Sequence, residues 1–240
     1  MCICGSSRYL YRLDRTKTRV EFLQPAATAT LKTTPPLPQD PSLGALAQSL
    51  AQQQAAWTAH WHGAVTPPDE LSAWDGLVLE QHRQNFDLWH AEDKARAPQA
   101  TDSEIAGVKR RIDKLNQERN DFIERLDEQL LVLLRQRGCA AHEHAPWNSE
   151  TPGGIVDRLS ILALKVYHMR EQEERADATR EHGERCKAKR ETLERQRADL
   201  ATALRVLLED LAAGRKQMKL YRQFKMYNDP ALNPEIYKAG

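Results

Sequence analysis

The sequence predicts an all-α protein: an antiparallel bundle of four to five long helices with a disordered N-terminal arm and an irregular C-terminal segment. The composition favours Ala, Leu, Glu, Gln and Arg, which are strong helix formers. Apolar residues recur at spacings of three and four over long stretches, as on one face of a helix. Capping residues and glycines divide these stretches into pieces of helical length.

We expect two helices in the first hundred residues. The first starts at Asp40-Pro41, where Asp is the N-cap and Pro the first helical residue, and it ends at Gly63. The second starts at Pro67-Pro68-Asp69 and ends before Pro98. Its apolar face becomes polar over its last turns.

Three further helices follow. A capping box from Thr101 to Glu104 opens a long helix that runs to about Arg137. Thr151 caps the next helix, with Pro at its first position. A run of alternating charge is broken between residues 177 and 183, and the last long helix ends at Gly214.

These elements predict three segments. Residues 1–40 form a disordered or loosely attached arm, because basic residues there give way to a Thr- and Pro-rich run. Residues 41–214 form the helical bundle. Residues 215–240 form a basic and aromatic segment, for which we expect the aromatic rings to pack on the bundle and the cations to stay in water. Clamping of a phosphate by that segment, or docking to a partner protein, stays open.

Composition and charge limit the function. The net charge of +1 gives no argument for a nucleic-acid partner. No apolar run approaches the roughly 18 residues that a membrane span needs. The first residues lack the apolar region of a signal peptide. We therefore expect a cytoplasmic protein without a membrane span.

Polar side chains lie beside the apolar stripes of three predicted helices, so we expect them to meet inside the bundle. Since buried charges are costly unless paired, they would share a network. Such a network either fixes the register of the helices, or it binds a polar ligand with His168, His90 or Asp157 as acid or base. The candidates are Asn85, His90, Asp93, Arg96, Asp113, Asn116, Asn120, Asp157, Lys165 and His168.

The start of the helix at Thr151 is a second candidate site. Unpaired N–H groups favour an anion there, and Gly153 and Gly154 would let a phosphate approach the backbone. Arg158 adds a positive charge one turn later. The alternative is that the glycines permit close packing against a neighbouring helix.

We expect neither a metal nor a cofactor. No Glu-x-x-His motif lies in a predicted helix, and the loop residues His142 and His144 have no evident third ligand. The four cysteines lack paired CxxC spacing. No P-loop or nucleophile-elbow motif is present, so the catalytic residues are unknown and the sequence leans against an enzyme.

Four stretches carry a resemblance to a known family: residues 88–96, 109–120, 148–170 and 221–230. In this order they resemble a bacterial family catalogued as a domain of unknown function, number 4254. The resemblance implies a helical cytoplasmic protein without an assigned activity. It also implies a link to surface-polysaccharide or lipopolysaccharide biosynthesis, because genes of similar proteins lie beside glycosyltransferase genes in such gene clusters.

The leading functional hypothesis is a non-enzymatic binding or accessory protein in surface-polysaccharide or lipopolysaccharide biosynthesis. Its partner would be a glycosyltransferase or another protein, and its ligand an anionic sugar or nucleotide-sugar. One alternative is an enzyme acting on a phosphorylated sugar or nucleotide-sugar, with the phosphate at the Thr151 helix start. The other is a purely structural bundle that forms a homodimer.

Overall fold

The computed structural model describes residues 43–63, 71–226 and 229–238, and within these ranges the long elements are all helices. The predicted all-α fold is thus confirmed. The predictions for the arm of residues 1–40 and for the helix start at Asp40-Pro41 lie outside the described residues. In order, the helices are α1 (Leu43–Trp61), α2 (Ala73–Ala95), α3 (Asp102–Gln136), α4 (Pro152–Glu173), α5 (Arg180–Ala212) and the short α6 (Pro234–Tyr237).

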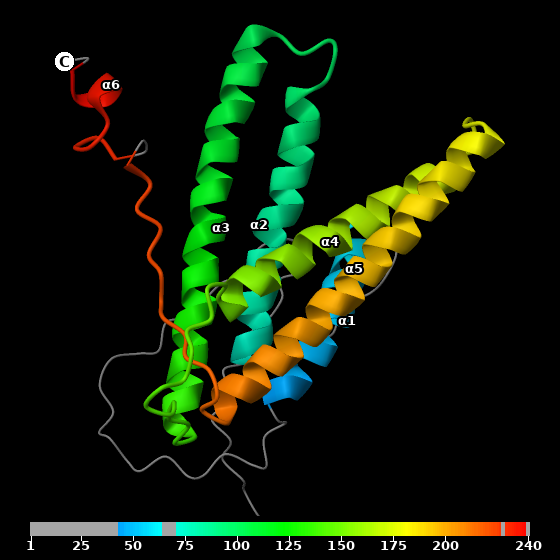
Figure 1. Ribbon diagram of the computed structural model, residues 1–240. Coiled ribbons are helices and arrows are strands. Elements are labelled where there is room, and N and C mark those ends of the chain that lie inside the picture. The colour runs from blue at the N-terminus through cyan, green and yellow to red at the C-terminus, as the bar shows by residue number, and fades with distance from the viewer. Residues whose placement is uncertain (1–42, 64–70, 227–228, 239–240) are drawn as a thin grey trace, which may run out of the picture.

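Two helical hairpins diverge from a shared base (Figure 1). Helices α2 and α3 form one antiparallel hairpin, and α4 and α5 form the other. Helix α1 lies against α5 and α4. Since α4 also contacts α2 and α3, it is the helix through which the two hairpins meet.

The second helix begins later than the sequence predicts. Residues 71 and 72 are not helical, and the Ser72 hydroxyl accepts a hydrogen bond from the Asp75 N–H at 3.1 Å. The predicted start at residues 67–69 is therefore wrong. Serine is as good an N-cap as aspartate, and capping preference alone could not choose between them.

The other predicted helix ends agree with the structure, except that the break predicted between residues 177 and 183 begins and ends a few residues earlier. Thr101 and Glu104 form the capping box of α3, and Thr151 caps α4 by accepting from the Gly154 N–H. Helix α5 ends just before Gly214, whose φ of 72° suits a residue without a Cβ. The break between α4 and α5 covers residues 174–179, and Thr179 caps α5.

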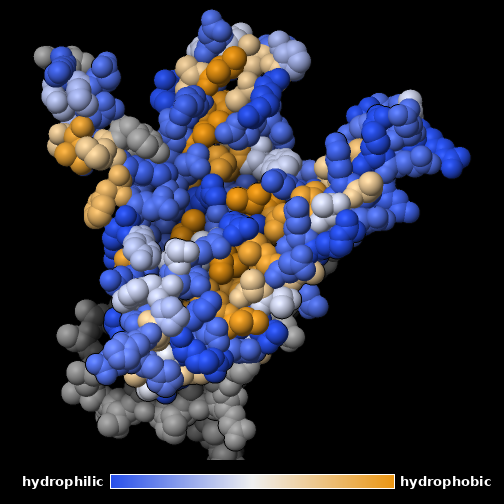
Figure 2. Space-filling view, viewed as in Figure 1, coloured by the Kyte–Doolittle hydropathy of each residue, from blue (hydrophilic) through white to orange (hydrophobic). Residues whose placement is uncertain are grey.

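The main hydrophobic core lies at the base where the hairpins meet. It is built from fully buried leucines of α1, α3, α4 and α5, among them Leu50, Leu126, Leu159 and Leu204. Each such side chain contributes on the order of 2 kcal/mol through burial. Figure 2 shows the molecular surface from the side seen in Figure 1, where most residues are polar and apolar residues gather where the hairpins diverge.

The C-terminal segment runs along α3 (Figure 1). The guanidinium of Arg222 pairs with Glu124 at 2.8 Å and Glu128 at 2.5 Å, and Lys225 donates to the Asn116 carbonyl at 3.0 Å. Phe224, however, is 84% exposed. The expectation of a packed ring is thus not met at Phe224, whereas Arg222 stays exposed as expected and also pairs with acidic residues of α3.

No helix in the described ranges is both long and apolar enough to cross a bilayer.

Candidate functional site

A buried ion pair joins the two hairpins. The Asp157 carboxylate of α4 is 6% exposed, and it accepts from Arg119 of α3 through Nε at 2.7 Å and through a second guanidinium nitrogen. From α2, Gln81 donates to the same carboxylate at 2.6 Å and Asn85 at 2.9 Å. The hydrogen bond to Asp157 raises the pKa of Arg119. The charge on Asp157 is thus fully partnered, which makes its burial tolerable.

This network continues into α1. Asn85 also donates to the Ser160 hydroxyl at 2.9 Å, and His82 Nδ1 lies 2.7 Å from the same oxygen. His82 Nε2 lies 2.9 Å from the Thr58 hydroxyl, which donates to the Gln54 carbonyl. Burial lowers the pKa of His82 to about 3, so this histidine is neutral. Four helices are therefore connected by one chain of buried polar contacts.

The N-terminus of α4 lies directly on α3. The Gly153 N–H donates to the Asp127 carboxylate at 2.7 Å. A Cβ on Gly153 would lie 2.5 Å from the Ile123 carbonyl oxygen, whereas on Gly154 it would meet nothing closer than 3.5 Å. Burial raises the pKa of Asp127 to about 6, against the lowering effect of hydrogen bonds from Thr151 and Gly153.

This geometry bears on the proposed anion site. The Gly153 N–H already donates to the Asp127 carboxylate, so it is not available to a phosphate. Gly153 is also needed because a side chain there would collide with α3. Arg158 is already paired with Glu150 at 2.8 Å. The helix start therefore has the contacts expected of the packing alternative.

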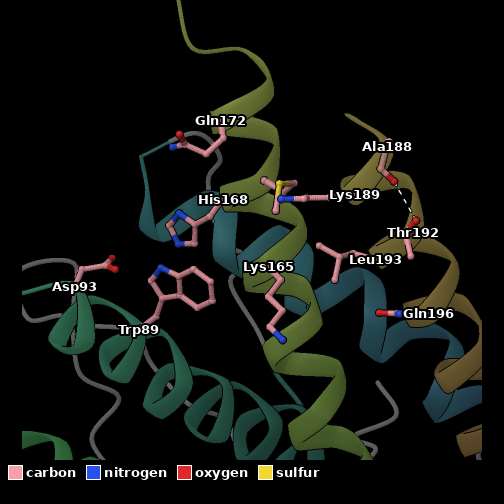
Figure 3. A pocket seen from close by; sticks show the side chains of 11 residues that line it. Trp89, Asp93, Lys165, His168, Gln172, Ala188, Lys189, Thr192, Leu193 and Gln196 are labelled. Atoms are coloured by element: carbon pink, nitrogen blue, oxygen red, sulfur yellow. Dashed lines mark hydrogen bonds between the residues drawn. The ribbon is translucent and has the colours of Figure 1, made fainter. Parts of the chain in front are cut away.

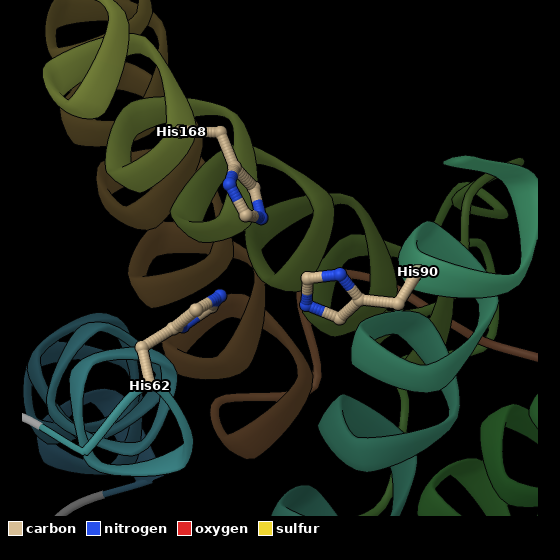
Figure 4. Close-up of side chains that lie close together, drawn as sticks. All are labelled: His62, His90 and His168. Carbon is tan, nitrogen blue, oxygen red and sulfur yellow. The ribbon is translucent and has the colours of Figure 1, made fainter. Parts of the chain in front are cut away.

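Three histidines converge about three turns further along α4. They are His62 at the end of α1, His90 of α2 and His168 of α4, and one ring nitrogen from each lies within 4.8 Å of the others (Figure 4). His62 Nδ1 contacts the Thr58 carbonyl at 2.7 Å, and His168 Nδ1 contacts Glu171 at 2.7 Å. The Nε2 atoms of His62 and His168 are buried without a hydrogen-bond partner among the described residues.

Aromatic rings surround the histidine cluster. His168 stacks on Trp89, with centroids 4.7 Å apart and planes 9° apart, and His62 stacks on Tyr167 at 4.2 Å. Burial, together with the other two histidines, lowers the pKa of His90.

The histidine cluster adjoins a surface groove of about 830 Å³ between α2, α4 and α5 (Figure 3). Among its lining residues are Trp89, Asp93, Lys165, His168, Gln172, Lys189 and Gln196. Both lysines are exposed, and neither forms an ion pair within the described ranges. Nearby cations differ, since Arg170 and Arg190 both pair with Glu194.

The structure divides the predicted polar cluster into separate groups. Asn85 lies with Asp157 in the buried network, whereas His90 lies with His168, and Asp93 and Lys165 lie on the groove wall. The remaining candidates belong to neither group. Arg96 pairs with Glu92 and Asp113 with Lys109 on their own helices, Asn116 offers its carbonyl to Lys225, and Asn120 is half-buried on α3.

Sequence reasoning missed several residues that complete these groups, among them Gln81, His82, Arg119, Asp127, Ser160 and His62. A signal for some of them was present. Gln54, Thr58 and His62 recur every fourth residue, as do His82, Phe86 and His90, so each set forms a stripe on one helix face.

Comparison with known proteins gives a family. Neither the search of curated proteins nor that of solved structures found a match. A family model described as a protein of unknown function (DUF4254) matches residues 75–220, which is more than half of the chain. This region includes the buried network on α2, α3 and α4 and the whole groove, whereas His62 precedes it. The chain therefore belongs to the DUF4254 family of proteins of unknown function.

Proposed function

We propose that this protein is a non-enzymatic binding protein that takes an anionic sugar or nucleotide-sugar into the groove between α2, α4 and α5. We further propose that it acts as an accessory protein in surface-polysaccharide or lipopolysaccharide biosynthesis, with a glycosyltransferase as its partner. The observation that carries the proposal is the groove itself, in which an aromatic wall faces two lysines without ion-pair partners.

The size and the wall of the groove suit a small polar ligand. Its volume of about 830 Å³ falls within the range of small-molecule sites, and its lining combines apolar surface with a few polar groups. The stacked rings of Trp89 and His168 offer a flat amphipathic surface. A sugar ring has an apolar face that packs on such a surface.

The charges of the groove favour an anion. Lys165 and Lys189 provide two positive charges and Asp93 one negative charge, which leaves an excess of one. A lysine ammonium is a compact point charge that binds phosphate or carboxylate oxygens. Gln172 and Gln196 each offer both a hydrogen-bond donor and an acceptor, as sugar hydroxyls require.

The enzyme alternative has less support. It requires phosphate at the Gly153 backbone with His168 and Asp157 beside it, but Asp127 holds that N–H and Asp157 is paired with Arg119. His168 lies in a different place, on the groove. The residues named for that reaction therefore do not share a pocket.

Titration calorimetry with a uridine diphosphate sugar, a sugar 1-phosphate and the neutral sugar tests the proposal. Binding of at least one anionic ligand is expected, with much weaker binding of the neutral sugar. Lys165→Gln and Lys189→Gln should each weaken binding by about tenfold, because each removes one charge-assisted contact. Lys187→Gln is the matched control, since Lys187 is exposed on α5 outside the groove lining.

Two outcomes would contradict the proposal: no binding of any anionic saccharide, or binding that neither groove substitution changes. For the partner, an affinity purification from the native host should recover a glycosyltransferase, and it should lose that protein when the groove lysines are replaced.

A further inference from the structure

We propose that His62, His90 and His168 form a binding site for a divalent transition metal ion of the kind that prefers imidazole ligands, such as Zn²⁺. The proposal goes beyond the groove function, because the ion would bind in the absence of any saccharide. The expectation of no metal relied on motifs within single helices. Here each ligand comes from a different helix, so no local motif marks the site (Figure 4).

The spacing of the ring nitrogens is close to that of a metal site. All three lie within 4.8 Å of one another. Around a tetrahedral Zn²⁺ with bonds of about 2.0–2.1 Å, neighbouring nitrogens lie roughly 3.3 Å apart. The nitrogens must therefore approach by up to about 1.5 Å, which side-chain rotations within one rotamer well can supply.

The histidines are also oriented as ligands. In metal sites the second ring nitrogen donates to a carbonyl or a carboxylate, which fixes the tautomer and directs the lone pair at the ion. His62 Nδ1 has the Thr58 carbonyl at 2.7 Å, and His168 Nδ1 has Glu171 at 2.7 Å. Their Nε2 atoms are buried and have no other partner within the described ranges.

The two buried Nε2 atoms of His62 and His168 also favour a bound ion. A cluster that served packing alone would gain nothing from two buried, unpartnered ring nitrogens.

Three protein ligands leave a further coordination position. His168 lines the groove, so the ion would lie next to the groove wall. Sites with three protein ligands keep the fourth position for water or for an oxygen of a bound molecule. The ion would thus add a positive charge at the end of the groove that also carries Trp89.

Competition between the full-length protein and a chromophoric chelator for Zn²⁺ tests the proposal. A single tightly bound equivalent is expected for the wild type. His90→Gln and His168→Gln should each lower the affinity by more than about a hundredfold, because losing a ligand costs more than losing a residue that only hydrogen-bonds to a ligand. Glu171→Ala, which leaves all three ligands in place, should lower it by about 10–100-fold.

Two controls separate this site from others. The double variant His142→Gln/His144→Gln removes the loop histidines and should retain the tight equivalent. Glu174→Ala changes an exposed acid nearly two turns beyond His168 and should have no effect. Circular dichroism shows whether each variant is folded, and Glu171→Ala keeps the test valid should a histidine variant unfold.

Three results would overturn the proposal: no tight Zn²⁺ binding, binding that survives both His90→Gln and His168→Gln, or binding that disappears with the loop histidines. Because the probe is Zn²⁺ alone, these results do not depend on the saccharide. A protein that binds Zn²⁺ but no anionic saccharide would contradict only the proposed function.

Discussion

Helix α4 carries two clusters of polar side chains that look alike in sequence and differ in structure. At its N-terminal end, Asp157 is surrounded by donors from α2 and α3, and its charge is matched by Arg119. About three turns further on, His168 meets two histidines, with buried nitrogens that have no partner among the described residues. The Asp157 carboxylate is fully partnered, although Gln54 and Gln81 of the same network each keep a buried amide oxygen without a partner among the described residues, and none of these residues lines the groove. The second cluster adjoins the groove through His168.

The difference teaches how to separate a structural network from a candidate site. A buried polar group that already has its partners stabilises the fold and has nothing left to offer a ligand. A buried group that lacks a partner is costly, and where it also lies beside a groove it marks a candidate site. By these two criteria the Asp157–Arg119 ion pair stabilises the fold, and the histidine cluster with its groove is the proposed site.

The largest expected effect is on stability, at the Asp157 cluster. Asp157→Ala leaves Arg119 partly buried and unpaired, so the free energy of unfolding should fall by about 3–5 kcal/mol in urea denaturation. Arg158→Ala breaks an exposed pair on the same helix and should cost less than about 1 kcal/mol. Asp157→Ala should still bind Zn²⁺ while folded. If Asp157→Ala lowers the free energy of unfolding by less than Arg158→Ala does, Asp157 is not a structural residue.

The glycine pair at the start of α4 gives a test with opposite signs at adjacent residues. Gly153→Ala places a Cβ 2.5 Å from the Ile123 carbonyl and should destabilise by about 1–3 kcal/mol. Gly154→Ala meets only ordinary contacts and should stabilise by up to about 1 kcal/mol, because alanine favours the helix. Thermal or urea unfolding checks both changes. Equal effects would contradict the close approach of α3 and α4.

A third test concerns pH. The pKa of Asp127 is higher in the folded protein, so the ionised carboxylate costs stability as pH rises from 3.8 to about 6. Asp127→Asn removes this cost and keeps an acceptor for the Gly153 N–H. Relative to the wild type, the variant should gain on the order of 1–2 kcal/mol across that interval in urea titrations. If the stability difference between Asp127→Asn and the wild type stays constant or shrinks with rising pH, burial does not raise the pKa of Asp127.

The smallest expected effect on stability is at the histidine cluster. His90→Gln should change the free energy of unfolding by less than about 1 kcal/mol near neutral pH, since it removes no paired charge. The pKa of His90 is lowered in the folded protein, so the wild type loses stability as pH falls below 6.5 and the variant avoids that loss. Urea denaturation of both proteins near neutral pH and below pH 6.5 measures these changes in the free energy of unfolding. A large loss at neutral pH would place His90 with the structural residues.

The sequence predicted the helices well because helix ends depend on contacts within a few residues. Thr101 with Glu104 and Thr151 with Gly154 make local hydrogen bonds that follow from spacing alone. The start of α2 was missed, since Ser72 competes with Asp69 and local preference does not rank them clearly. The correct ends and the missed start both depend on capping contacts within a few residues, which sequence identifies only where one candidate cap is clearly preferred.

The candidate site could be predicted only in part. Asn85, Asp157, His90 and His168 were recognised as interior polar residues, but one helix cannot show which residues of another it faces. His62 was missed because it lies in the last turn before Gly63, where the sequence marks only a helix end. The crossing of α1 over α2 and α4 brings it to His90, and that crossing is a property of the whole fold.

X-ray diffraction from crystals grown with Zn²⁺, recorded at the zinc absorption edge, tests the central claim most directly. An anomalous peak is expected between the ring nitrogens of His62, His90 and His168, and no peak is expected beside Asp157. An absent peak at the histidines, or a peak within the Asp157 network, would contradict the division of α4 into a structural end and a binding end.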